Sequence, residues 1–154
     1  MNVPAGGRTD IALPDGTKVM LNAGSRLSYT SEFNKRTRNI FLSGEGYFEV
    51  AHDKERPFNV NTSKCTVTVL GTKFDISAYE QDGEAFTALV EGSILFKTGE
   101  EETLVSPGEL VTIGDKGLTK EAVDVRDYCG WTSGIIKYSN IPFSSLLKRL
   151  EREY

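Results

Sequence analysis

The sequence predicts a mainly β fold, an antiparallel β-sandwich or β-roll of many short strands, followed by an incomplete strand-helix unit. Three observations lead to this prediction. Short runs rich in β-branched and aromatic residues are separated by glycine, proline and aspartate over most of the chain. Apolar and hydroxyl side chains alternate over Cys65–Val69, as they do on a half-buried strand. Helical periodicity is confined to residues 144–154.

The first hairpin has a physical cause in its turn residues. Strands are expected at Asp10–Leu13 and Thr17–Leu21, on either side of Pro14-Asp15-Gly16. Proline presets its φ, aspartate bonds to its own backbone, and glycine accepts a positive φ. We therefore expect Gly16 at positive φ in a chain reversal.

Further strands follow the same alternation of apolar runs and turn residues. They are expected at Arg26–Tyr29, Arg38–Leu42, Tyr47–Val50, Phe58–Asn61, Cys65–Leu70, Phe74–Tyr79, Ala85–Val90, Ser93–Lys97, Thr103–Val105, Leu110–Ile113 and Leu118–Ala122. Similar turns, each with a glycine between two strands, are expected at Leu42–Glu45, Val90–Ser93 and Val105–Glu109. Cys65 shares a strand face with Val67 and Val69, which predicts a core residue.

The chain changes character after Val125. A strand is expected at Ile135–Ser139, and Pro142 then introduces an amphipathic helix over Ser144–Tyr154. The apolar side chains on one stripe of this helix are Phe143, Leu146, Leu147, Leu150 and Tyr154. A helix this short is marginal in isolation, so it must dock on another element. A strand and a helix with no returning strand indicate a domain that is cut short.

These patterns predict three parts. Residues 1–9 are expected to be a disordered linker, residues 10–126 one β-domain, and residues 127–154 the start of a truncated αβ domain. Trp131 follows Gly130 at the last junction, which favours packing between the two domains over a role as a sugar platform.

Length and charge restrict the class of protein. The chain has 154 residues, enough for one domain and a fragment of another. Its net charge of -4 provides no basic field for a phosphate backbone, so we expect no nucleic-acid partner. No apolar run approaches the roughly 20 residues that span a bilayer, and the first residues lack the pattern of a signal peptide.

No catalytic residue, metal site or cofactor is predicted, and the protein is not expected to be an enzyme. His52, the only histidine, lies in the charged segment Ala51–Pro57, which is typical of a solvated loop. A Ser-His-Asp triad would also need a nucleophile elbow, which the sequence lacks. The segment Glu102–Ile113 has the strand, proline-glycine turn and strand pattern of a cupin-like metal barrel. The metal sites of such barrels take several histidines, and this sequence has one.

Other chemical interpretations are weaker. Gly44-Glu45-Gly46 opens like a dinucleotide fingerprint, but a strand follows where a helix is needed. Glu45, Glu49 and Asp53 recur every fourth residue and could line one strand face. The catalytic acids of glycosidases come from different elements that face each other across a cleft, so this row is not expected to be catalytic. Cys65 and Cys129 are far apart and in no Cys-x-x-Cys pair, so two free thiols are expected.

Four blocks of sequence occur in order between Asp10 and Ile113. They are LPDGTKVMLNAGSRL at 13–27, FLSGEGYFEV at 41–50, RPF at 56–58 and VLGTKF at 69–74. Val90-Glu91-Gly92-Ser93 and Pro107-Gly108-Glu109 continue the pattern. In order and spacing these blocks strongly resemble the FecR family of transmembrane anti-sigma regulators.

The resemblance implies a signal relay. In that family a cytoplasmic anti-sigma segment and one transmembrane helix precede a periplasmic FecR domain, and a small αβ domain similar to the secretin and TonB short N-terminal domain often follows. Residues 10–126 would be the FecR domain and residues 127–154 the start of the αβ domain. The cytoplasmic part, the membrane helix and the remainder of the last domain would lie outside this chain, with Met1 an introduced start. The implied partners are the signalling domain of an outer-membrane TonB-dependent transporter and, through the absent cytoplasmic region, an extracytoplasmic-function sigma factor. The implied location is the periplasm, with the full-length protein in the inner membrane. The resemblance transfers no catalytic residue.

The truncated strand-helix unit is the predicted partner-binding surface. Its candidate residues are Ile135, Ile136, Tyr138 and Leu147. A single strand leaves backbone groups unpaired, and exposed edges recruit other strands. The alternative is a carbohydrate-binding or adhesin-type β-sandwich, which aromatic side chains on an exposed face would support. Against it, the aromatic residues Tyr47, Phe48, Phe58, Phe74 and Phe96 lie within predicted strands.

Overall fold

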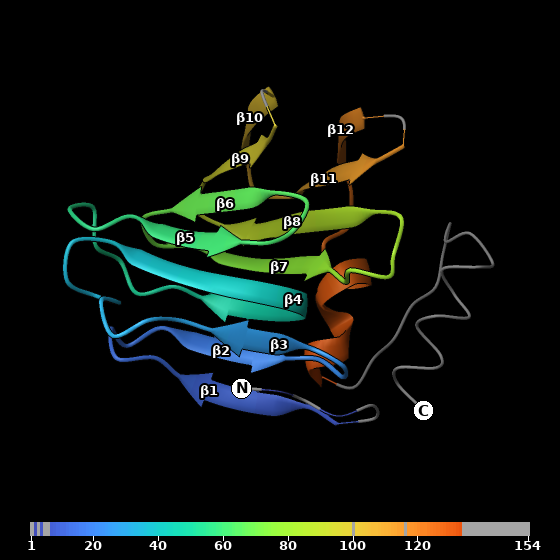
Figure 1. Ribbon diagram of the computed structural model, residues 1–154. Helices are drawn as coiled ribbons and strands as arrows, with labels where there is room; N and C mark the ends of the chain where they lie inside the picture. Colours follow the sequence, from blue (N-terminus) through green and yellow to red (C-terminus); the bar gives the residue numbers. More distant parts are fainter. Residues whose placement is uncertain (1, 3, 5–6, 100, 116, 134–154) are drawn as a thin grey trace.

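Twelve strands and two short helical segments make up the described part of the chain (Figure 1). The structure is a computed structural model, and it describes residues 2, 4, 7–99, 101–115 and 117–133. The strands are β1 (Thr9–Ala12), β2 (Lys18–Leu21), β3 (Arg26–Ser28), β4 (Arg38–Glu49), β5 (Phe58–Asn61), β6 (Thr66–Val69), β7 (Lys73–Ala78), β8 (Ala85–Glu91), β9 (Ile94–Thr98), β10 (Glu101–Val105), β11 (Glu109–Gly114) and β12 (Gly117–Ala122). The helical segments are α1 (Arg126–Cys129) and the 3-10 helix η1 (Gly130–Ser133). The predicted mainly β fold is confirmed.

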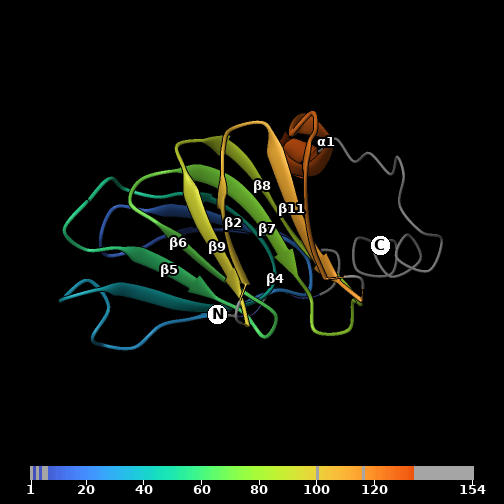
Figure 2. The same cartoon turned by 90° about the horizontal axis from the view of Figure 1, so that it is seen from above.

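Strand β4 joins two halves of the sheet. Its first half pairs with β3 and β5, and its second half pairs with β2 and β7. Sheet A therefore runs β3-β4-β5-β6-β9-β10, and sheet B runs β1-β2-β4-β7-β8-β11-β12. Among the described pairings only that of β4 with β5 is parallel. The two halves curve around a common core, as in a sandwich or roll (Figure 2).

Gly44 marks the point where β4 passes from sheet A to sheet B. The sequence predicts a turn at Leu42–Glu45, which is wrong, because one twelve-residue strand runs through it. Gly44 has a φ of 121°, and a Cβ here would lie 2.3 Å from the Oγ of Ser25. Only glycine combines that backbone angle with so close a neighbour, so the residue bends the strand and does not end it.

Aromatic rings fill the core between the halves. Phe48 and Phe74 stack with their centroids 5.2 Å apart, and Phe58 packs edge-on against Phe48 at 6.1 Å. These three rings have no exposed surface, and neither has Phe96. Burying each side chain contributes roughly 1.5–3 kcal/mol, so these residues are structural, as predicted. Cys65 is also buried in this core, in agreement with the strand pattern.

The first hairpin has the predicted turn. Gly16 has a φ of 92°, and its N–H donates to the carbonyl of Leu13 at 3.0 Å. The carboxylate of Asp15 accepts from the N–H and the hydroxyl of Thr17, at 3.0 and 2.7 Å. Strands β1 and β2 pair antiparallel on either side.

The start of the described chain pairs with strands of both sheets, and its end lies beside sheet B. At the start, β1 begins at Thr9, and Asn2 forms an isolated bridge with Arg26. At the end, α1 lies outside the sheet, beyond β8 and β11 (Figure 2). The predicted strand at Ile135–Ser139 and helix at Ser144–Tyr154 lie outside the described residues. The described part of the chain contains no helix that is long and apolar enough to cross a membrane.

Candidate functional site

The outer face of β4, β7 and β8 joins distant parts of the chain. Residues 125–133, which run through α1 and η1 and are called the connector below, cover this face. The face presents Asp75 of β7 and Phe86 of β8, and Glu45 of β4 lies beside them. It is the candidate functional site because it fixes how the chain leaves the β-domain.

Trp131 anchors the connector. Only 5% of its surface is exposed, and its Nε1–H donates to the Oδ1 of Asp75 at 2.9 Å. Both groups are buried, and a hydrogen bond to a carboxylate is stronger than one between neutral groups. The predicted packing of Trp131 against the β-domain is therefore present, whereas the other side of the predicted junction lies outside the described residues.

A second aromatic contact holds the same segment. The rings of Tyr128 and Phe86 meet edge-on with their centroids 5.2 Å apart. By contrast, α1 has no buried residue, and its N-cap residue Val125 makes no side-chain capping hydrogen bond. A four-residue helix has no stability of its own, so these two contacts position the connector.

The polar groups beneath the connector are acidic and buried. Glu45 is 4% exposed, and its Oε1 accepts from the Nδ2 of Asn22 at 3.1 Å. Burial, with the charges of Asp75 and Glu45, raises the pKa of the Cys129 thiol well above its usual range. Because a thiolate is the reactive form, this environment disfavours nucleophilic chemistry at Cys129.

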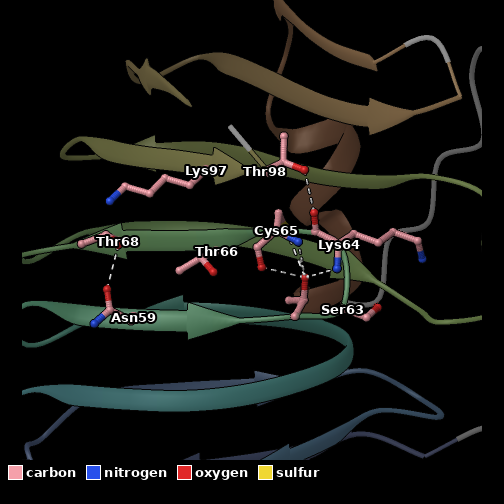
Figure 3. A pocket seen from close by; sticks show the side chains of 10 residues that line it. Asn59, Ser63, Lys64, Cys65, Thr66, Thr68, Lys97 and Thr98 are labelled. Atoms are coloured by element: carbon pink, nitrogen blue, oxygen red, sulfur yellow. Dashed lines mark hydrogen bonds between the residues drawn. The ribbon is translucent and has the colours of Figure 1, made fainter. Parts of the chain in front are cut away.

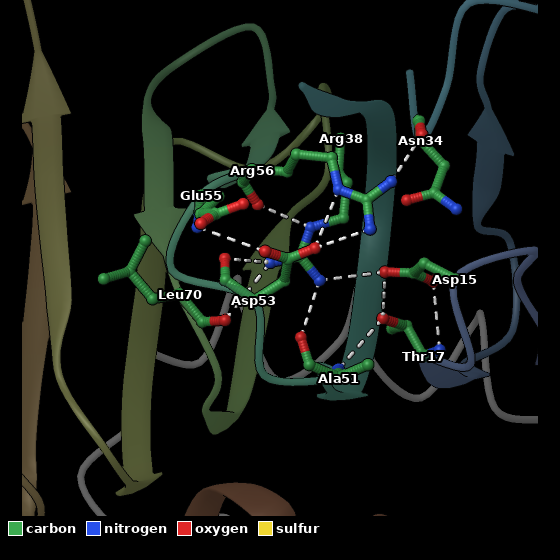
Figure 4. A network of polar contacts seen from close by, with 9 residues as sticks. All are labelled: Asp15, Thr17, Asn34, Arg38, Ala51, Asp53, Glu55, Arg56 and Leu70. Carbon is green, nitrogen blue, oxygen red and sulfur yellow. Dashed lines mark hydrogen bonds and ion pairs between the residues drawn. The ribbon is translucent and has the colours of Figure 1, made fainter. Parts of the chain in front are cut away.

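Arg38 forms a second polar centre, at the start of β4 (Figure 4). Its side chain is 1% exposed and pairs with Asp15 at 3.0 Å. The guanidinium also donates to four backbone carbonyls, those of Arg56, Ala51, Asp53 and Leu70, at 2.7, 2.6, 3.2 and 3.1 Å. Every partner comes from a loop or a strand end, so Arg38 fastens these segments together. This arrangement is structural.

The charged loop that contains His52 is more ordered than the sequence indicates. His52 is exposed, as predicted. Asp53 and Arg56, however, form an ion pair at 2.7 Å, and Arg56 also donates to the carbonyl of Asn34 at 2.8 Å (Figure 4). The hydrogen bond from Arg56 lowers the pKa of Asp53.

A shallow hollow of about 460 Å³ lies over β5, β6 and β9 (Figure 3). Its lining includes Asn59, Thr66, Thr68 and Lys97. The hydroxyl of Thr68 donates to Asn59, whose amide donates to Asn39, each at 2.7 Å. Among the described residues, the lining supplies amides, hydroxyls, ammonium groups and the Cys65 thiol, and no carboxylate.

The other predicted residues are not brought together. Glu45 is buried, Glu49 is exposed, and Asp53 lies in the loop, so the carboxylate row does not form. Cys65 and Cys129 are both free thiols. The described residues contain no group of three His, Cys, Asp or Glu side chains arranged to hold a metal ion. Ile135, Ile136, Tyr138 and Leu147 lie outside the described residues.

Sequence reasoning missed the two charged anchors, Arg38 and Asp75. A signal was present for Arg38, because it shares strand parity with the buried residues Ile40 and Leu42. Asp75 stands between Phe74 and Ile76, and no pattern within β7 shows that Trp131 covers it.

Comparisons with known proteins agree with this architecture. A sequence model of the family described as FecR protein matches residues 1–95. Two crystal structures of a protein from Parabacteroides distasonis ATCC 8503, assigned as an anti-sigma factor and solved at 2.50 and 1.65 Å resolution, are similar to this chain. Each is 31% identical and superposes with a TM-score of 0.96 over 100% of this chain and 73% or 74% of its own length. None of the curated proteins searched matches.

Proposed function

The chain belongs to the FecR family, and from this membership we propose that it is the signal-relay part of an anti-sigma regulator. The observation that carries the proposal is the 31% identity, over the whole chain, to a protein assigned as an anti-sigma factor. A regulator of this kind has a sigma factor as its partner. The resemblance of the sequence to FecR proteins supports the same role.

The finer proposal concerns the direction of the signal. The signalling domain of an outer-membrane TonB-dependent transporter contacts the segment that follows the connector, and the contact is passed through the β-domain towards its N-terminal side. There the full-length protein crosses the inner membrane and controls an extracytoplasmic-function sigma factor. In this proposal the β-domain is periplasmic, and no nucleic acid, cofactor or catalytic step takes part.

The architecture suits transmission by contact. The edge-on contact of Phe48 with Phe58 and the Arg38 network join the two halves into one body. Such a body moves as a unit when a partner displaces one of its ends. A relay of this kind depends on where the connector docks, and Trp131 determines that position.

The test is a transcription reporter for the sigma factor, in cells that carry the full-length protein. Ile136→Asp and Leu147→Asp place a charge in the predicted contact segment. We expect both variants to lose the response to the transporter's substrate while the protein stays folded and abundant. Leu104→Asp is the matched control, because Leu104 is 68% exposed on β10 and its charge should leave the response intact.

Two results would count against the proposal. A normal response in both variants would remove the partner contact from this segment and place it on the β-domain. Failure of the chain, extended to the complete last domain, to retain any transporter signalling domain in a pull-down would remove the transporter as the source of the signal.

A further inference from the structure

The residues before β1 and the connector after β12 meet on Trp131. The Cζ of Arg8, which directly precedes β1, lies 5.8 Å from the centroid of the Trp131 ring. On its polar edge the indole donates to Asp75 of β7. A strand of sheet B, the C-terminal connector and the N-terminal segment are therefore linked through one side chain.

Trp131 belongs to both contacts at once. Its hydrogen bond to Asp75 fixes the plane of the ring, and a fixed ring face is what a guanidinium needs for a cation-π contact. If the connector leaves the sheet, Arg8 loses this ring. If the N-terminal segment leaves, the outer face of the indole loses its cover. Each docking thus stabilises the other.

We propose that Trp131 couples the two ends of the β-domain. Release of the connector then loosens the segment before β1, and release of that segment loosens the connector. The inference deepens the proposed function, on which it rests for its biological meaning, by naming the residue through which the two sides communicate. An exposed cation-π contact corresponds to a coupling factor of about two to five. Coupling between two equilibria is reciprocal, so the factor is the same in both directions.

Native-state hydrogen exchange on the whole 154-residue chain measures both equilibria. The connector is followed at the amides of Tyr128 and Cys129, which donate to the carbonyl of Val125 at 3.0 Å. The N-terminal side is followed at Thr9, the first residue of β1. Arg8→Ala should raise exchange at the connector about two- to five-fold, and Trp131→Phe should raise exchange at Thr9.

The double variant isolates the coupling. Because Arg8 has contacts besides the ring, the effect of Arg8→Ala alone does not identify the ring as its cause. If the ring carries the coupling, Arg8→Ala should no longer change exchange at the connector in a Trp131→Leu background. Arg36→Ala removes an arginine that is also exposed and lies in the loop before β4, and it is the matched control. Circular dichroism confirms that each variant remains folded, and Trp131→Met, which also lacks an aromatic ring, replaces Trp131→Leu if the latter does not.

The coupling is refuted if Arg8→Ala changes exchange at the connector no more than Arg36→Ala does. It is also refuted if Arg8→Ala acts equally with and without the Trp131 ring. The exchange measurements need neither transporter nor sigma factor. If they show coupling while the reporter and pull-down fail, the coupling stands and the proposed function falls.

Discussion

The Nη1 of Arg38 and the Oδ2 of Asp15 lie 3.0 Å apart, with only 1% and 4% of the two side chains exposed. Asp15 belongs to the turn of the first hairpin, and Arg38 begins β4. The pair therefore joins the edge of sheet B to the strand shared by both halves. Removing one member of a buried ion pair leaves an uncompensated charge, which costs far more than losing an exposed pair.

Arg38→Met should lower the free energy of unfolding by about 3–5 kcal/mol, because Asp15 and four carbonyls lose their donor. Urea denaturation followed by circular dichroism measures this. Lys35→Ala is the control: it breaks the pair with Glu32, in which 63% and 75% of the side chains are exposed, at a cost of at most about 1 kcal/mol. Similar losses in the two variants would contradict a structural role for the network.

Thr87 and Thr17 are both fully buried but differ in their hydroxyls. Within the described part of the chain, the Oγ1 of Thr87 has no hydrogen-bond partner, whereas that of Thr17 donates to Asp15 and accepts from the N–H of Ala51. Thr87→Val should therefore raise the free energy of unfolding by about 1 kcal/mol, and Thr17→Val should lower it by about 1–3 kcal/mol. The same denaturation assay compares them. A loss of stability in Thr87→Val would show that its hydroxyl is bonded.

Gly44 and Gly16 both have positive φ but differ in their surroundings. A Cβ on Gly44 would lie 2.3 Å from Ser25, whereas a Cβ on Gly16 would meet only Ala51 at 3.9 Å. Gly16→Ala should cost about 1–2 kcal/mol from backbone strain alone. Gly44→Ala adds overpacking and should cost at least about 3 kcal/mol. Equal melting temperatures for the two variants would show that β4 is not constrained at this point.

The sequence was a good guide to the strands and a poor one to what connects them. Alternation within a strand depends on local burial, so Phe58 and Val60 could be assigned to the core in advance. The continuity of β4 could not, because it depends on Ser25, which directly precedes β3, approaching Gly44. A glycine after a strand end has the same local pattern whether the chain turns or bends.

The candidate site was harder to predict for the same reason. Trp131 could be assigned a packing role from its position after Gly130, but its partner Asp75 lies 56 residues earlier in the sequence. A buried aspartate between two apolar residues looks like an error in the strand pattern until the covering indole is known. Charged residues at inward or covered positions, such as Arg38, are the signals to follow in similar sequences.

The pKa of Tyr47 links the candidate site to stability at alkaline pH. Burial, together with the nearby carboxylates of Glu49, Asp75 and Glu91, raises this pKa from 10.0 to about 12. Between these values the unfolded chain releases a phenolic proton that the folded chain keeps. The contribution of Tyr47 is therefore fully present below pH 10 and is lost as the pH rises from 10 to about 12.

Tyr47→Phe removes the group that titrates, so the variant should lose less stability than the original protein between pH 10 and 12. Urea denaturation midpoints at intervals of pH from 9 to 12 measure the two slopes. Tyr29→Phe removes a phenol that is 43% exposed and far from the connector in sequence, and it controls for the loss of one tyrosine. If Tyr47→Phe and the original protein lose stability in parallel, Tyr47 does not keep its proton in the folded state, and the face beneath the connector is open to water.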